Sequence, residues 1–208
     1  NTAFSDGGLA GRQAGKEKLK SSIKNAVMYG GGSKEDAADT MNELLAAGVD
    51  YDTADKWLPQ IMKYATASGA LPKELATIAV SLRDTFNVSD KDIPVALNMA
   101  IAAGKEGRVE LKDMAEALPG QLGIAQKTGM WGLDGFQKIL TANEAAGITA
   151  GNGKEAANNT LNFLDKINSK QAADAAANIK MANGKYIDLP GTMTMARERG
   201  IDPIEAFN

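Results

Sequence analysis

Apolar residues recur three and four positions apart along most of this chain, and that spacing places them on one face of an α-helix. The clearest run extends from Leu75 to Phe86, with apolar residues at the helical intervals i, i+3, i+4, i+7 and i+11. Comparable runs predict helices near residues 9–29, 34–47, 50–65, 72–86, 90–104, 111–118, 136–146, 161–167, 172–181 and 193–199. The pattern predicts an all-α fold.

Several helix boundaries carry residues with known end preferences. Ser33 is a good N-cap, and acidic Glu35 and Asp36 follow it in the first turn. Pro72 suits a first helical turn, where a missing N–H leaves no bond unmade. Pro59 lies inside a predicted helix and therefore predicts a kink or a break there.

One type of helix connection recurs along the chain. A residue that tolerates the left-handed conformation ends a helix, an apolar residue packs back on it, and an N-cap residue begins the next helix. The copies are Gly48-Val49-Asp50, Asn87-Val88-Ser89, Gly147-Ile148-Thr149 and Gly200-Ile201-Asp202. Their spacing is irregular, so they are not a true repeat. They predict a stack of short-linked antiparallel helices, or αα-hairpins.

Other segments depart from this scheme. The helix that begins near Leu111 is predicted to end at Pro119-Gly120, and residues 186–190 are predicted to form a loop or a short extended segment. Residues 1–32 are predicted to form a lysine-rich helical arm that ends in a hinge of three glycines. Residues 33–208 are predicted to form the main helical domain.

Composition narrows the chemistry that the chain can perform. It has no cysteine and no histidine, which excludes thiolate catalysis, disulfides and any Ser-His-Asp or Cys-His site. The formal net charge of -3 gives no overall basic surface for nucleic acid. No apolar run is long enough to cross a membrane and no signal peptide is visible. Because the chain begins at Asn1 rather than Met, we expect it to be a piece of a longer protein.

Two short motifs resemble ligand sites but have simpler explanations. Asp50, Asp52 and Asp55 are spaced like the start of a calcium loop, yet Ala54 takes the third ligand position and no closing Glu follows. Helix capping explains these acids better. The segment 30–34 has the order Gly-Ser-Lys, whereas a phosphate loop needs Gly-Lys-Ser or Gly-Lys-Thr after a strand. We expect neither a metal site nor a cofactor site.

Charged pairs offer two further candidates. Glu74 and Asp84 could in principle hydrolyse a glycan as paired carboxylates, but both are predicted on solvated helix faces. Lysines between Lys16 and Lys24 could contact a nucleic-acid backbone, but no aromatic or arginine side chains lie among them. A solvated helix face is the simpler interpretation. We therefore assign no catalytic residue and no specific nucleic-acid partner.

Large apolar side chains supply the remaining candidates. Trp57 and Trp131 are predicted to be core or interface anchors rather than ligand platforms. Met193 and Met195 could form a soft interface toward further chain. These four residues are the candidate interface residues.

From about Met41 onward the chain resembles the core region of phage tail tape measure proteins. The segment 42–50 is similar to that family's helix ending in Ala-Gly-Val/Leu-Asp, and Leu58-Pro59 lies in a similar following stretch. Phe86-Asn87-Val88-Ser89 resembles a family turn, with Asn87 in place of the usual Gly. Residues 101–118 resemble a Gly-containing block that ends in Ala-Glu-Ala-Leu, and later helices match in order.

The resemblance implies a structural, non-enzymatic role. Tape measure proteins fill the lumen of the growing tail tube and set its length, so the resemblance implies tail length determination and tube assembly through protein–protein contacts. The implied partners are the tail tube protein, tail assembly chaperones, tail tip proteins and other copies of the chain. The implied locations are the tail tube lumen of the virion and, during assembly, the host cytoplasm, with transient contact with the host envelope at infection.

Two alternatives from other functional classes stay open at this point. One is a peptidoglycan-hydrolysing domain carried within a tape measure protein, for which zymography is the discriminating test. The other is a membrane-active helical domain, for which liposome leakage is the test. Narrow apolar stripes and frequent Gly turns favour a soluble domain over the second alternative.

Overall fold

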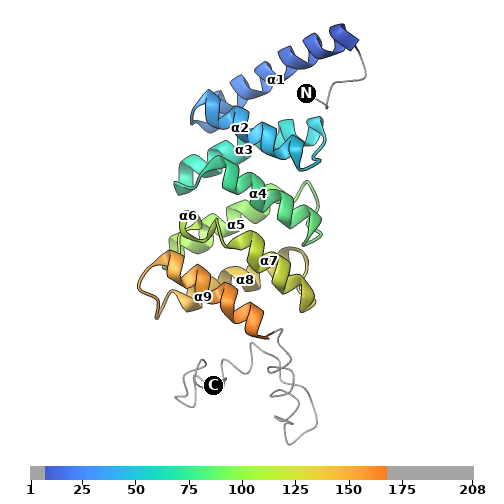
Figure 1. Ribbon diagram of the computed structural model, residues 1–208. Coiled ribbons are helices and arrows are strands. Elements are labelled where there is room, and N and C mark those ends of the chain that lie inside the picture. The colour runs from blue at the N-terminus through green and yellow to red at the C-terminus, as the bar shows by residue number, and fades with distance from the viewer. Residues whose placement is uncertain (1–7, 168–208) are drawn as a thin grey trace, which may run out of the picture. The chain divides into compact units, whose positions relative to one another are not determined.

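The computed structural model describes residues 8–167, and every regular element in that range is a helix (Figure 1). This confirms the predicted all-α fold. The helices are α1 (Gly8–Gly30), α2 (Lys34–Ala46), α3 (Tyr51–Ser68), α4 (Pro72–Asp84), α5 (Ile93–Glu106), α6 (Leu111–Met114), α7 (Leu118–Lys127), α8 (Gly132–Ala146) and α9 (Gly153–Ile167). The predicted helices at 172–181 and 193–199 and the segment 186–190 lie outside the described residues.

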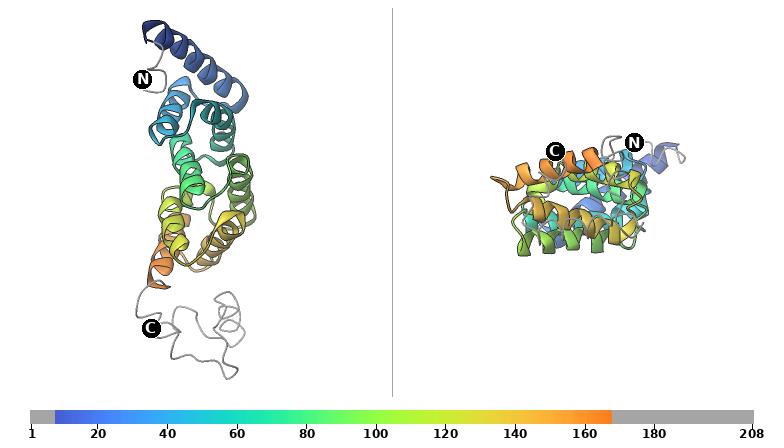
Figure 2. Two further views of the ribbon diagram at one scale, coloured as in Figure 1. Left: turned by 90° about the vertical axis from the view of Figure 1, so that its right-hand side faces the viewer. Right: turned by 90° about the horizontal axis from the view of Figure 1, so that it is seen from below.

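Helices that alternate along the chain pack side by side. Within the compact unit that ends at Leu161, α1, α3, α5 and α8 form one layer, and α2, α4 and α7 form the other (Figure 2). The part of α9 that precedes residue 162 lies against α7, where Gln121 Nε2 donates to the Ala157 carbonyl at 2.8 Å, and against α8, where Thr160 Oγ1 donates to the Ala142 carbonyl at 3.4 Å. The unit is thus a two-layered stack of antiparallel hairpins, the arrangement of an α-solenoid.

The core lies between the two layers and is built from the predicted stripes. The apolar residues of the stripe on α4 are each fully buried, as are their partners on the neighbouring helices. These core residues include Met41, Leu44, Leu58, Ile61, Leu75, Ile78, Leu82, Ile93, Leu97, Leu118, Leu122 and Phe136. Burial of such side chains contributes about 1.5–3 kcal/mol each relative to exposure, which makes it the main stabilising term.

The predicted helix starts are largely confirmed. Ser33 caps α2 with a full capping box, in which the Asp36 N–H donates to Ser33 Oγ at 3.0 Å. Asp50 caps α3 by accepting from the Thr53 N–H, also at 3.0 Å. Pro72 is the first residue of α4. The predicted break at Pro59 is wrong, since α3 continues through it as one helix.

The recurring connection is confirmed in full in its first copy, where Val49 is buried and Asp50 caps α3, and in part in its second. Gly48 has φ of 80° and Asn87 has φ of 54°, so both adopt the predicted left-handed conformation. Val88 is buried, as the pattern predicts for its middle residue. Ser89, however, does not cap α5, because that helix begins at Ile93 after a further turn. The Ser89 hydroxyl instead donates to Asp92 Oδ2 at 2.6 Å within that turn.

The third copy of the connection is wrong. Gly147 has φ of -63°, which any residue adopts, and Ile148 is 58% exposed instead of packing back. The next helix begins only at Gly153, after Asn152 Oδ1 accepts from the Glu155 N–H at 2.9 Å. An Asn cap near the helix start replaces the predicted Thr149. The fourth copy lies outside the described residues.

The predicted helix end at Pro119-Gly120 is also wrong. A short helix, α6, ends at Met114, and α7 then begins at Leu118 and continues through both residues to Lys127. Pro119 lies in the first turn of α7, where it removes no intrahelical hydrogen bond. Pro119 therefore lies at the start of a helix and not at its end. Helix α7 is the helix that the sequence pattern missed.

Helix α1 packs along α3. Its buried residues include Ser22 and Ala26, and the Ser22 hydroxyl lies 2.6 Å from the Tyr51 hydroxyl at the start of α3. At its end, the Gly30 carbonyl accepts from Thr66 Oγ1 at 2.9 Å. The glycine at this junction thus allows α1 to pack closely against α3. The predicted hinge stays a prediction. The predicted domain boundary at residue 32 stays a prediction.

Replacing Gly30 by alanine is expected to lower the free energy of unfolding by about 1–3 kcal/mol. A Cβ at this position would lie 2.6 Å from Met62 Cβ and 2.6 Å from the Pro59 carbonyl oxygen, so α1 and α3 would have to separate. Gly123→Ala is the matched control, because a Cβ there meets nothing within 4 Å. Urea unfolding followed by circular dichroism should show the control equal to or more stable than the original protein. Equal destabilisation by both changes would contradict the packing role of Gly30.

Candidate functional site

Of the acidic residues considered as metal ligands, Asp50 caps α3 and Asp52 lies in its first turn. Hydrogen bonds from Thr53 hold the pKa of Asp50 below its ordinary value, because they stabilise the charged carboxylate. This confirms helix capping for Asp50. Among residues 8–167, no group of three or more Asp, Glu, His or Cys side chains is arranged to hold a metal ion.

Glu74 and Asp84 do not form a carboxylate pair. They lie in the first turn and at the last residue of the same helix, α4. At 1.5 Å of rise per residue, ten residues separate them by about 15 Å along the axis. Glycosidase carboxylates lie roughly 5–9.5 Å apart, so these two cannot act on one glycosidic bond. Asp84 instead accepts from Arg83 Nη2 at 3.0 Å.

The two tryptophans lie in different environments. Trp57 is 3% exposed, and its indole Nε1 donates to the Asp90 carbonyl at 3.0 Å. The Arg83 guanidinium lies over its ring at 5.9 Å from the centroid. Trp131 lies in the connection between α7 and α8 and is 49% exposed. Trp57 is therefore a core anchor, whereas Trp131 exposes a large part of its aromatic surface.

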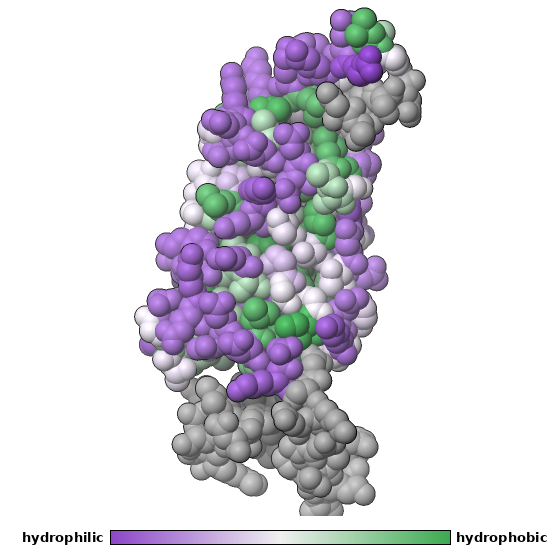
Figure 3. Space-filling view, viewed as in Figure 1, coloured by the Kyte–Doolittle hydropathy of each residue, from purple (hydrophilic) through white to green (hydrophobic). Residues whose placement is uncertain are grey.

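Met193 and Met195, the other two candidate interface residues, lie outside the described residues. Within the described part of the chain, the exposed large apolar residues are few and scattered, and several lie in helix connections. They are Leu9, Met28, Tyr29, Leu71, Val95, Trp131 and Ile148. Figure 3 shows one face, on which small apolar areas lie among hydrophilic residues. The interface role of the tryptophans and methionines stays a prediction.

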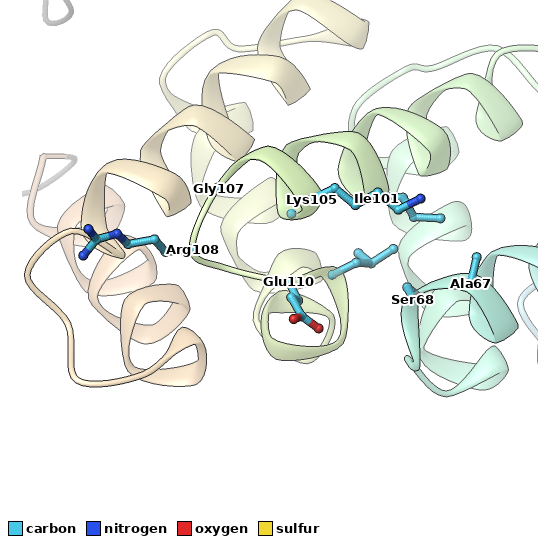
Figure 4. A pocket seen from close by; sticks show the side chains of 9 residues that line it. Ala67, Ser68, Ile101, Lys105, Gly107, Arg108 and Glu110 are labelled. Atoms are coloured by element: carbon cyan, nitrogen blue, oxygen red, sulfur yellow. The ribbon is translucent and has the colours of Figure 1, made fainter.

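The hollow drawn in Figure 4 has a volume of about 380 Å³ and lies where α3 and α5 end, beside the connection to α6. It is lined by Ala67, Ser68, Ile101, Gly104, Lys105, Gly107, Arg108, Glu110 and Leu111. Its charged residues Lys105, Arg108 and Glu110 are all exposed, and the Arg108 side chain lies apart from the others in Figure 4. Solvated charges of this kind do not form the desolvated, converging set that catalysis requires.

The connection from α5 to α6 runs beside this hollow (Figure 4), and the Glu144 carboxylate, which the figure does not draw, holds it in place. Glu144 Oε2 on α8 accepts from the Arg108 N–H at 2.7 Å and from the Val109 N–H at 3.3 Å. Gly107 allows this approach, because a Cβ there would overlap the carboxylate. The contact ties α8 to the connection that precedes α6.

A buried amide pair is the feature that sequence reasoning missed. Gln121 Nε2 donates to Asn143 Oδ1 at 2.9 Å, and Asn143 Nδ2 donates to Gln121 Oε1 at 2.8 Å. Both residues are 0% exposed, and Asn143 also donates to the Ile139 carbonyl. With the bond from Gln121 to the Ala157 carbonyl, the pair joins α7, α8 and α9. A sequence signal existed, since Asn143 occupies an apolar position of the stripe on α8.

The described side chains therefore form surfaces and packing contacts, and the candidate carboxylates Glu74 and Asp84 do not converge. Within residues 8–167, no helix is both long enough and apolar enough to cross a membrane. The described side chains offer exposed aromatic and charged groups on a stack of hairpins, which suits contacts with other proteins.

Comparison with known proteins adds an independent finding. Residues 16–202 match a family described as phage-related minor tail proteins. The chain is 31% identical over 159 residues to a protein named "Probable tape measure protein" from Burkholderia phage BcepMu. That alignment covers 76% of this chain and 19% of the phage protein, so the chain spans about a fifth of its relative. No solved structure matches the chain significantly.

Proposed function

Because the chain belongs to the phage-related minor tail protein family, we propose that it is an assembly module of a tape measure protein and acts through protein–protein contacts. The family gives it a structural role in the phage tail. The proposal goes further, to the determination of tail length and the assembly of the tail tube. The observation that carries it is a compact hairpin stack without converging reactive groups among residues 8–167.

Length setting would belong to the whole, longer protein rather than to this unit alone. A ruler gains most length from continuous helix, which advances 1.5 Å per residue, so residues 8–161 would extend about 230 Å as one helix. The longest helix of the described residues is α1, with 23 residues, which corresponds to about 35 Å. The remaining helices fold back on one another in two layers. Such a unit suits anchoring, capping or assembly better than spanning.

The proposed partners follow from this role. They are the tail tube protein, tail assembly chaperones, tail tip proteins and further copies of the chain, met in the host cytoplasm during assembly and then in the tube lumen. Transient contact with the host envelope at infection is part of the same proposal. Half-exposed Trp131 is a candidate anchor for one of these contacts, because tryptophan is enriched among the residues that dominate binding energy at interfaces.

The test is an in-frame deletion of residues 8–161 from the full-length protein in its phage, followed by electron microscopy of the tails. If the unit is an assembly module, few tails should form, and their length should change far less than the roughly 230 Å that an extended segment would contribute. A deletion of the same number of residues from a continuous helical region of the same protein is the control. That control should shorten the tails while leaving their number closer to normal.

Two outcomes would contradict the proposal. Normal numbers of tails at normal length would mean that residues 8–161 are not needed for assembly. Normal numbers shortened by about 230 Å would mean that these residues work as extended ruler rather than as a folded module. The alternatives of peptidoglycan hydrolysis and membrane activity have no supporting observation among the described residues, since Glu74 and Asp84 lie too far apart and no helix there fits a bilayer.

A further inference from the structure

Helix α1 carries a row of positive charges that the described residues 8–167 leave largely uncompensated. Arg12, Lys16, Lys20 and Lys24 follow one another at four-residue intervals and are all exposed; we call these four residues the basic stripe. Consecutive members are neighbours on the helix surface, and like charges at this spacing destabilise a helix. Within α1 the only acidic residue is Glu17, which pairs with Lys20 at 2.8 Å. An acidic partner would relieve this repulsion.

The beginning of α1 is also open to a partner. The first buried residue of the helix is Gly15, and Leu9 is 68% exposed. Figure 1 shows this end of α1 extending past the helices beneath it. A helix that is polar on most sides and has few stabilising ion pairs is usually supported by a neighbour. Buried residues of α1 occur from Gly15 onward, whereas residues 8–14 contain none.

The complementary surface lies on the same chain, where the α2–α3 and α4–α5 connections meet. Exposed Asp50, Asp84 and Asp90 gather around Arg83 there; we call these three aspartates the acidic edge. The edge is held firmly, because buried Trp57 donates to the Asp90 carbonyl at 3.0 Å. Their charges also raise the pKa of Arg83, chiefly through its hydrogen bond with Asp84.

An exposed aromatic side chain lies beside the acidic edge. The Gly132 N–H donates to the Phe86 carbonyl at 2.8 Å, which brings the α7–α8 connection against the α4–α5 connection. Trp131, in that connection, is half exposed. The surface therefore combines negative charge with an apolar anchor, and α1 offers positive charge with exposed Leu9. Such a combination supplies both orientation and buried area to a contact.

We propose that the basic stripe of one copy docks on the acidic edge of a second copy. A second copy fits better than nucleic acid, because the acidic edge would repel a polyanion and no aromatic side chains lie within the stripe for base stacking. The two surfaces differ, so the contact is head-to-tail and joins further copies into a ring or an open chain. This docking proposal draws on the proposed function for one point only, namely that several copies of the chain meet in the tail.

The test uses the isolated chain in analytical ultracentrifugation over a range of protein concentrations. We expect self-association that weakens as salt is added, because exposed charges are screened. Two reversal variants probe the two surfaces. One carries Lys16→Glu, Lys20→Glu and Lys24→Glu, and the other carries Asp84→Lys and Asp90→Lys. Each alone should raise the apparent dissociation constant roughly tenfold or more. Circular dichroism checks that each variant keeps its helix content.

Mixing the two reversal variants is the decisive measurement. In the mixture the reversed stripe meets the reversed edge and the unchanged edge meets the unchanged stripe, so the mixture should associate more tightly than either variant alone. The control replaces Lys127 and Lys138, exposed lysines outside the stripe, by glutamate and should leave association unchanged. Failure of the mixture to associate, or a monomeric original protein that binds duplex DNA through the stripe, would overturn the proposal. Either result would leave the tail role proposed above intact.

Discussion

Replacing Phe86 by alanine is expected to lower the free energy of unfolding by about 3–5 kcal/mol, the range for a fully buried phenylalanine. Phe86 is 0% exposed and lies just after α4. Its ring reaches α8, since a Cβ added at Gly135 would lie 2.9 Å from Phe86 Cε1, and its carbonyl accepts from the Gly132 N–H. The truncation would leave a cavity between α4 and α8 that rigid helices cannot close.

Urea unfolding measured by circular dichroism tests this expectation, with Tyr29→Ala as the matched control. Tyr29 is 74% exposed, so its truncation should change stability by no more than about 0.5 kcal/mol. In thermal unfolding, the melting temperature should likewise fall much further for Phe86→Ala than for Tyr29→Ala. A loss below about 1 kcal/mol for Phe86→Ala would mean that the α4–α8 contact is looser than the structure indicates.

Replacing Asn143 by leucine should cost about 2–4 kcal/mol, because it leaves Gln121 Oε1 buried without a donor and removes two further hydrogen bonds. Gln121→Leu should have a similar effect, since Asn143 Oδ1 then loses its donor. The measurement is again equilibrium unfolding in urea.

The double variant Gln121→Leu with Asn143→Leu separates this explanation from a simple loss of packing. If unsatisfied polar atoms cause the loss, the double variant should be destabilised by less than the sum of the two single changes, because both partners are then apolar. We expect a coupling energy on the order of 1–3 kcal/mol. Strictly additive losses would show that the amide pair does not act as a unit.

The sequence predicted the helices well where apolar stripes were long and their starts carried capping residues. The stripe on α4 and the Ser33 cap are signals that depend on residues close together in the sequence, and the structure confirms both helices. The prediction of α7 failed because Pro119-Gly120 was taken as a helix end, although proline is equally suited to a first turn. The predicted left-handed helix end at Gly147 was wrong because glycine permits the left-handed conformation but does not require it.

Long-range features could not be derived from the sequence. Trp57 and Trp131 look alike in the sequence, yet one is buried over the α4–α5 connection and the other is half exposed. The partner of Asn143 lies 22 residues away in a helix that was not predicted. The family was recognisable because the order of several weak motifs carried more information than any one of them.

The two-layered stack has a mechanical consequence. Each helix touches mainly its neighbours in the stack, so tension on the chain reaches the outermost hairpin first and loads the inner ones only after it gives way. A freed hairpin of about 30 residues could stretch to on the order of 100 Å. Pulled from its ends, this unit would not resist as one rigid block but would lengthen stepwise, one hairpin at a time.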